Sequence, residues 1–222
     1  VLDAVLPREL LGDQLGVVDE LDLVGAERAS AFEPEQQRAR ECGGSVFAEM
    51  DKLAAKISAG SEGVLFLPYM AGERSPIWNP YAKGVFYGLD FTKTRAHFYR
   101  AAMEGVAYSL RHNLEIAAQA GAPVTQLHAM GGAANSKLWT QIKSDVTGLP
   151  IRSAKSDMAT TLGAAMLAGV ATGVYKDYAQ AVQQTVNMER SYVPNEENSS
   201  VYERGFCDYL KLYSQLETLM HG

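Results

Sequence analysis

The feature that most constrains this chain is an apolar run followed by two glycines and a helical pattern. Residues 127–130 (LHAM) are mostly apolar, Gly131 and Gly132 follow, and residues 136–148 (SKLWTQIKSDVTG) have the apolar spacing of an amphipathic helix. An apolar run this short is typical of a buried strand. Glycine lets the backbone turn sharply, because it has no Cβ. The stretch therefore predicts a strand, a tight turn and a helix in immediate succession.

This arrangement favours an anionic ligand. A helix that begins near Asn135 or Ser136 presents free N–H groups and the positive end of its dipole, and both residues are suitable N-caps. Bare amides in the glycine turn allow a ligand to approach the backbone closely. An ordinary strand-to-helix turn is the alternative, since a Gly-Gly turn alone is weakly specific. The candidate ligand-binding residues are Gly131, Gly132, Ala133, Asn135 and Ser136.

Strand and helix patterns alternate from residue 43 onward. The expected strands are 64–69, 84–90, 125–130 and 150–154, and the expected helices are 47–57, 94–121, 136–148, 159–173, 175–186 and 198–220. This alternation predicts an α/β fold in which helices cover a largely buried sheet. We expect the long helix 94–121 to turn one face inward, formed by Phe98, Ala102, Val106, Leu110 and Leu114.

The first 41 residues form a separate unit in this interpretation. They are acidic and rich in Glu, Gln and Arg, and they lack the alternation of strands and helices. We therefore divide the chain into a poorly assigned segment, 1–41, and one domain, 42–222. The chain does not begin with Met, which is compatible with a fragment or a processed product.

Composition excludes several classes of function. A formal net charge of -6 and a sequence pI near 5.3 argue against a nucleic-acid surface, which needs clustered Lys and Arg. Cys42 and Cys207 are far apart, and the four histidines lack metal-ligand spacing, so neither a disulfide framework nor a zinc site is indicated. No apolar run reaches the roughly 18 residues of a membrane span. We expect a cytoplasmic protein.

Two further motifs are informative but ambiguous. The loop 72–80 (GERSPIWNP) follows a buried strand, where loops often carry function, yet Glu73 and Arg74 are equally compatible with a solvated ion pair and Trp78 with a hydrophobic plug. Residues 156–169 (SDMATTLGAAMLAG) are rich in Gly and Ala, with Asp157 as an N-cap option. A tightly packed helix explains them, and such a helix could also help to form the wall of a nucleotide pocket.

Four motifs together resemble the carboxy-terminal lobe of the FGGY carbohydrate kinases, the family of xylulokinase, gluconokinase and glycerol kinase. They are residues 66–80 (FLPYMAGERSPIWNP), 83–111 (KGVFYGLDFTKTRAHFYRAAMEGVAYSLR), 130–151 (MGGAANSKLWTQIKSDVTGLPI) and 157–173 (DMATTLGAAMLAGVATG). Within the second motif, the residues that agree with the family signature are Gly84, Phe86, Gly88, Leu89, His97, Phe98, Ala101, Ala102, Met103 and Glu104. The Glu-Arg pair of the loop 72–80 is closer to xylulokinase than to glycerol kinase.

The resemblance implies an actin-like ATPase (ribonuclease-H-like) lobe with a mixed sheet flanked by helices. It implies ATP and Mg as cofactors, with sugar bound chiefly by an amino-terminal lobe and adenosine by this one. Gly131, Gly132 and Ala133 would line the adenosine and phosphate turn, Ser136 would take an adenine-side polar contact, and Asn135 is an adjacent candidate. Gly43 and Gly44 resemble a turn near the terminal phosphates, although the spacing to residue 66 is short.

The departures from the family pattern limit the functional hypothesis. The acidic-glycine hairpin that organises Mg and triphosphate has no counterpart in this sequence, and no catalytic base can be placed; Asp13 in GDQ reads better as a surface turn. We therefore expect the nucleotide side of a kinase acting on a ketopentose such as xylulose, inactive alone. The alternatives are another acceptor, such as gluconate or glycerol, and an orphaned non-catalytic lobe that binds or dimerises.

Overall fold

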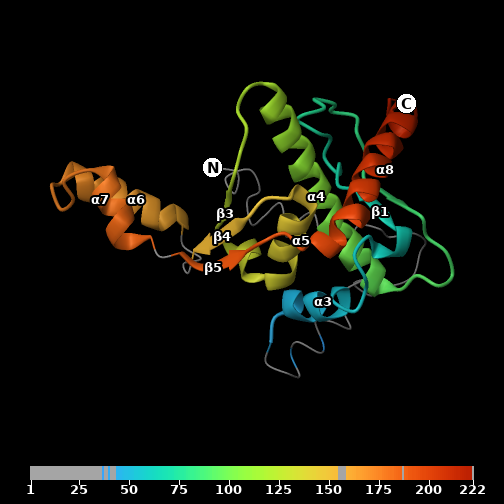
Figure 1. Cartoon of the computed structure of the whole chain (residues 1–222), viewed down its shortest axis with the longest axis horizontal. Helices are drawn as coiled ribbons and strands as arrows, with labels where there is room; N and C mark the ends of the chain where they lie inside the picture. Colours follow the sequence, from blue (N-terminus) through green and yellow to red (C-terminus); the bar gives the residue numbers. More distant parts are fainter. Residues whose placement is uncertain (1–36, 38–39, 41–43, 155–158, 187, 222) are drawn as a thin grey trace.

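The computed structural model describes residues 37, 40, 44–154, 159–186 and 188–221. The elements, labelled as in Figure 1, are α3 (Val46–Ala54), η2 (Ser61–Gly63), β1 (Leu65–Leu67), β2 (Val85–Tyr87), α4 (Arg95–Gln119), β3 (Leu127–Ala129), η3 (Gly132–Asn135), α5 (Lys137–Thr147), β4 (Ile151–Ala154), α6 (Ala159–Ala171), α7 (Tyr178–Thr185), β5 (Met188–Tyr192) and α8 (Glu196–Met220). Each strand and helix expected from residue 44 onward is present; most are shorter than expected, whereas α8 begins two residues earlier. The α/β prediction is confirmed.

The strand before the glycine turn, β3, belongs to a sheet of three strands in the order β3-β4-β5. β3 and β4 are parallel and are joined through α5, whereas β5 pairs antiparallel with β4, so the sheet is mixed. The alternation of buried and exposed residues in β3 and β4 shows that one face of each strand packs inward. The sequence pattern did not identify β5, because residues 188–192 (MERSY) carry charged and polar side chains instead of an apolar run.

Two long helices, α4 and α8, build the core together with α5 and β1 (Figure 1). Tyrosines fill much of the space between them, because their rings pack as apolar groups. The hydroxyls of Tyr69 and Tyr209 are 2.6 Å apart, whereas the buried hydroxyl of Tyr108 has no hydrogen-bond partner within the described part of the chain. Gly105 lets α4 approach β1, since a Cβ there would lie 2.3 Å from the carbonyl oxygen of Phe66. The result is a rigid support for the β3–η3–α5 segment.

The expected inner face of α4 is wrong in part. Only Leu114 of the five predicted residues is fully buried, and the others are partly buried. The buried residues are instead distributed around the helix and include His97, Arg100 and Glu104. The physical reason is that α4 packs against α3, β1, α5 and α8 from several sides, so a single apolar face does not describe it.

α6 and α7 form a hairpin that extends to one side of the other elements (Figure 1). The tight packing expected of α6 is confined to its last turns. A Cβ at Gly169 would lie 2.6 Å from the ring of Tyr175, whereas residues such as Leu167 stay exposed. Asp157 lies outside the described residues. Among the residues that the structure describes, no helix is long and apolar enough to cross a membrane.

Candidate functional site

The turn after β3 has a backbone conformation that requires glycine. Gly131 adopts φ 81° and ψ -176°, a region essentially closed to residues with a side chain. A Cβ placed on Gly131 would meet nothing within 4 Å, so the space above this residue is open. The neighbouring Gly132 is exposed. The turn thus needs glycine at position 131 and is accessible to a ligand.

The segment between the turn and the next helix differs from the expectation. A 3-10 turn, η3, covers residues 132–135, and α5 begins only at Lys137. Ser136 is the N-cap, and its hydroxyl accepts a hydrogen bond from the N–H of Trp139 at 3.0 Å. Asn135 therefore does not cap the helix; it is exposed in η3. The tighter 3-10 geometry separates the glycines from α5 by one extra turn.

The first N–H groups of η3 remain available. Within η3, the N–H of Ala134 bonds to the carbonyl of Gly131, and the N–H of Ser136 bonds to that of Ala133. Over the described part of the chain, no acceptor is assigned to the N–H of Gly132 or Ala133. The N-terminal N–H groups of any helical turn lack intrahelical partners, and anions bind such groups well. The geometry fits the predicted phosphate contact.

Helix α3 supplies a residue that the sequence did not point to. Met50 and Ala54 are buried against Tyr99, and Leu138 of α5 packs on the same cluster. Next to Met50, the carboxyl of Asp51 is half-buried. Burial raises the pKa of the Asp51 carboxyl, and the neighbouring Ser136 hydroxyl opposes that rise. Sequence spacing carries no signal for Asp51, because its place beside Ser136 depends on how α3 packs against α5.

The second pair of candidate glycines is not joined to this turn by any described contact. Gly43 lies outside the described residues. Gly44 is exposed and precedes Ser45, the N-cap residue of α3, and a Cβ there would meet nothing within 4 Å. A role for this pair near the terminal phosphates stays a prediction.

The loop 72–80 has an ordered internal structure. Glu73 and Asn79 exchange backbone hydrogen bonds of 2.8 and 2.7 Å, and the Glu73 carboxylate accepts the N–H of Ser75 at 2.8 Å. The Asn79 side chain is buried and donates to the Tyr213 hydroxyl at 2.8 Å. Trp78 is 74% exposed, so it is not a hydrophobic plug. Glu73 and Asn79 thus hold the loop in shape.

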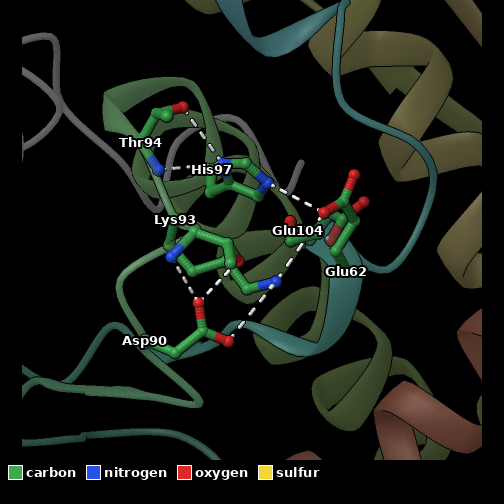
Figure 2. A network of polar contacts seen from close by, with 8 residues as sticks. Glu62, Asp90, Lys93, Thr94, His97 and Glu104 are labelled. Carbon is green, nitrogen blue, oxygen red and sulfur yellow. Dashed lines mark hydrogen bonds and ion pairs between the residues drawn. The ribbon is translucent and has the colours of Figure 1, made fainter.

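Polar residues around the start of α4 are structural (Figure 2). His97 is buried, and one ring nitrogen lies 3.1 Å from the N–H of Thr94 in a capping box while the other lies 3.1 Å from Glu62. Lys93 forms ion pairs with Glu62 and Asp90 at 3.7 and 3.9 Å. These contacts bind η2 to α4. His97 therefore has a structural role at the start of α4.

A cavity of about 530 Å³ lies away from the glycine turn. It borders Gly148 and Leu149, at the opposite end of α5. Arg111 lines the cavity, and its positive charge is paired, because its guanidinium bonds to Glu115 at 2.9 Å and to Glu203 at 2.8 Å. The cavity is therefore a crevice between α4, α5 and α8 with an ion-pair network in its wall. Because it lies away from the motifs that resemble the family, we assign the candidate site to the glycine turn.

The described residues contain no group of three or more His, Cys, Asp or Glu that could hold a metal ion. A magnesium ion beside the glycine turn would therefore need ligands from a nucleotide or from residues outside the described part. Mg stays a prediction.

The comparison with known proteins assigns the family. Residues 21–172 match the FGGY family of carbohydrate kinases, C-terminal domain, and this chain belongs to that family. A xylulose kinase from Staphylococcus epidermidis is 34% identical over 173 residues, which are 78% of this chain and 35% of the relative. A gluconokinase from Bacillus subtilis is 35% identical over 169 residues, 76% of this chain and 33% of the relative. The chain thus spans about a third of the length of these curated relatives.

The solved structures support the same assignment. The crystal structure of xylulose kinase from Rhodospirillum rubrum superimposes with a TM-score of 0.75 and 29% identity, covering 95% of this chain and 39% of that one. The actin-like ATPase fold predicted from the motifs is confirmed by this likeness.

Proposed function

We propose that this chain is the nucleotide-binding lobe of an ATP-dependent sugar kinase. The observation that carries the proposal is the turn at Gly131, which combines a glycine-only conformation, open space and free N–H groups at Gly132 and Ala133 in a member of the FGGY family. The cofactor would be ATP with Mg, and its chemistry is transfer of the γ-phosphoryl group to a sugar hydroxyl.

The residues of this chain would bind and orient the nucleotide. The N–H groups of Gly132 and Ala133 would donate hydrogen bonds to phosphate oxygens without the help of a cation, which suits a chain with net charge -6. Trp139 fixes α5 on α4, because its indole N–H donates to the Met103 carbonyl at 3.0 Å. Proton removal from the acceptor hydroxyl needs a base, which we assign to an amino-terminal lobe acting together with this chain.

The acceptor we favour is a ketopentose such as xylulose. Support comes from the Glu-Arg pair of the loop 72–80 and from the relatives and structure named xylulose kinase. Gluconate is the second candidate, since a relative named gluconokinase is equally similar. Acceptor residues would lie mainly in the other lobe, so an activity assay is needed to identify the acceptor.

Calorimetry of the full chain with ADP tests the nucleotide-binding proposal. We expect weak binding, in the range of about millimolar Kd, because the phosphate-organising hairpin is missing while the glycine turn is present. No heat from a folded sample at that concentration would count against the site.

A variant of Gly132 and a control variant make the test specific. Gly132→Val places a branched side chain where a ligand must approach the backbone, so we expect ADP affinity to fall at least about tenfold. Ala120→Val introduces the same side chain at the exposed end of α4, which precedes β3, whereas the glycine turn follows it, and it should leave affinity unchanged. Equal affinity in both folded variants would remove Gly132 from the site.

A further inference from the structure

One face of the three-stranded sheet is exposed in the part of the chain that the structure describes. On the covered face, Leu127 and Ile151 are buried with Leu114 of α4. On the opposite face, His128 and Arg152 lie beside each other in the pairing of β3 with β4, and both are exposed. In Figure 1 the α6–α7 hairpin extends to one side of the sheet. Because parallel strands usually have helices on both faces, we expect the exposed face to have a partner.

The chemistry of this open face, formed by His128, Arg152, Ser191 and Val193, defines the partner. Arg152 lies on the central strand, between His128 of β3 and Ser191 of β5. No ion pair is assigned to Arg152 within the described residues. Val193 follows Ser191 by two positions and is 66% exposed. A suitable partner therefore carries carboxylates for the cationic centre and an apolar side chain for Val193.

The chain contains such a partner before α3. Residues 1–36, which lie outside the described residues, include nine acidic and two basic residues, so they carry a formal charge of -7, whereas residues 37–222 carry +1. Within them, residues 19–24 (DELDLV) combine three carboxylates with three apolar side chains. In an extended segment, alternate residues share a face, and Glu20, Asp22 and Val24 then form one acidic and apolar face.

Two observations favour this segment over a separate partner. The family match begins at residue 21, so part of the acidic segment belongs to the family domain. The 22 positions from Val24 to Val46 (46 - 24), where α3 begins, can span up to about 70 Å at roughly 3.3 Å per residue. Helix α4, with 25 residues, is only about 37 Å long. The connection is therefore long enough to reach the sheet from α3.

We propose that residues 19–24 dock on the open face of the β3-β4-β5 sheet. The carboxylates of Glu20 and Asp22 pair with Arg152 and lie near His128, and Val24 covers Val193. The acidic segment is then part of the lobe instead of a separate unit. This inference goes beyond the proposed function and does not depend on it.

Carboxyl labelling of the full chain, with a water-soluble carbodiimide and glycine ethyl ester, tests the docking. A carboxylate that is paired with a guanidinium reacts more slowly than a free one. We expect Glu20 and Asp22 to react at least about threefold more slowly in the full chain than in an isolated peptide of residues 12–31, a factor within the range of a partly exposed ion pair. Mass spectrometry of proteolytic peptides measures the rates.

Two variants of one chemical type make the test specific. Arg152→Gln removes the cation from the open face, so labelling of Glu20 and Asp22 should approach the rate in the peptide. Arg190→Gln is the matched control: Arg190 is exposed on β5, but it is paired with Ser153, whose side chain lies on the covered face. This control should leave the slow labelling unchanged. Circular dichroism verifies that both variants are folded.

Four results would overturn the proposal. Labelling of the original chain at the rate of the peptide would show that the segment does not dock. Slow labelling that persists in Arg152→Gln would place the segment on another surface, and an equal loss in Arg190→Gln would reduce the effect to general charge. Slow labelling that disappears on tenfold dilution would place the segment on a second copy of the chain. Each result leaves nucleotide binding untouched.

Discussion

At the scale of single residues, Glu104 is a buried polar group with several hydrogen-bond partners. Its carboxylate is buried and accepts the N–H of Gly60 at 3.0 Å and the hydroxyl of Ser61 at 2.7 Å. It also forms an ion pair of 2.7 Å with Arg100, and the Tyr202 hydroxyl bonds to both partners. Four donors thus satisfy one buried carboxylate, which joins the turn before β1 to α4 and α8.

We predict that Glu104→Gln destabilises the fold by about 3–5 kcal/mol. The amide keeps the shape but removes the charge that compensates the buried guanidinium of Arg100, and its NH₂ group cannot accept from these donors. Urea unfolding measures the change. The control, Glu115→Gln, breaks a half-exposed pair with Arg111 and should cost no more than about 1 kcal/mol. Similar losses in both variants would show that the Glu104 network is not specially stabilising.

At the scale of elements, η2 is held in place by side chains of the following helix. Ser61 and Glu62 both have a φ of 50°, in the left-handed region that residues with a side chain seldom adopt. Bonds to Glu104 and His97 stabilise this conformation. The short, strained η2 turn thus depends on its contacts with α4. These contacts attach the residues beside η2 to the core.

The attachment of η2 to α4 should weaken at low pH. The hydrogen bond and charge of His97, together with Lys93, hold the pKa of Glu62 below its ordinary value of 4.5. The folded state therefore binds fewer protons near this pH than the unfolded state, so the contribution of Glu62 is complete above 4.5 and is lost as the pH falls through the lowered value. We expect the stability difference between the original chain and Glu62→Gln to shrink below pH 4.5.

Urea unfolding of both proteins from neutral pH down to a pH of about 3 measures this difference. The effect should be small, because half of the Glu62 side chain is exposed. A constant difference across the range would contradict the linkage.

At the scale of the whole molecule, the proposed phosphoryl transfer would need more than this lobe. The chain spans about a third of the relatives it matches, and the described residues contain the glycine turn but no group of acidic, His or Cys side chains that could hold a metal ion. Closure of two lobes would exclude water and align the acceptor hydroxyl, which a single lobe cannot do. The division at residues 41 and 42 and self-association of the lobe both stay predictions.

We predict that a polypeptide joining this chain to an amino-terminal lobe phosphorylates xylulose with MgATP, and that this chain alone does not. A coupled assay of ADP release with xylulose, gluconate and glycerol compares the two proteins. Turnover by this chain alone that is abolished by Asp13→Asn would place a catalytic residue in the GDQ segment. Failure of the joined protein with every acceptor would favour the non-catalytic binding lobe.

Local sequence patterns predicted much of the fold. Glycines, caps and apolar periodicity predicted the β3 to α5 segment and the order of the other elements, because these signals act between near neighbours in the chain. The same patterns left β5 unrecognised and misplaced the buried face of α4. Both depend on partners distant in the sequence: β5 is stabilised by pairing with β4, and polar residues of α4 are buried only because α8 and η2 complete their hydrogen bonds.

The candidate site divides in the same way. The sequence by itself determined the family motifs and the glycine turn, since a left-handed, open backbone position needs glycine whatever surrounds it. Only the tertiary structure decided that Ser136, not Asn135, caps α5 and that α3 packs beside this cap. Packing between helices so far apart in the chain has no periodic signature in the sequence. It arises because apolar side chains of α3 and α5 are buried in one cluster.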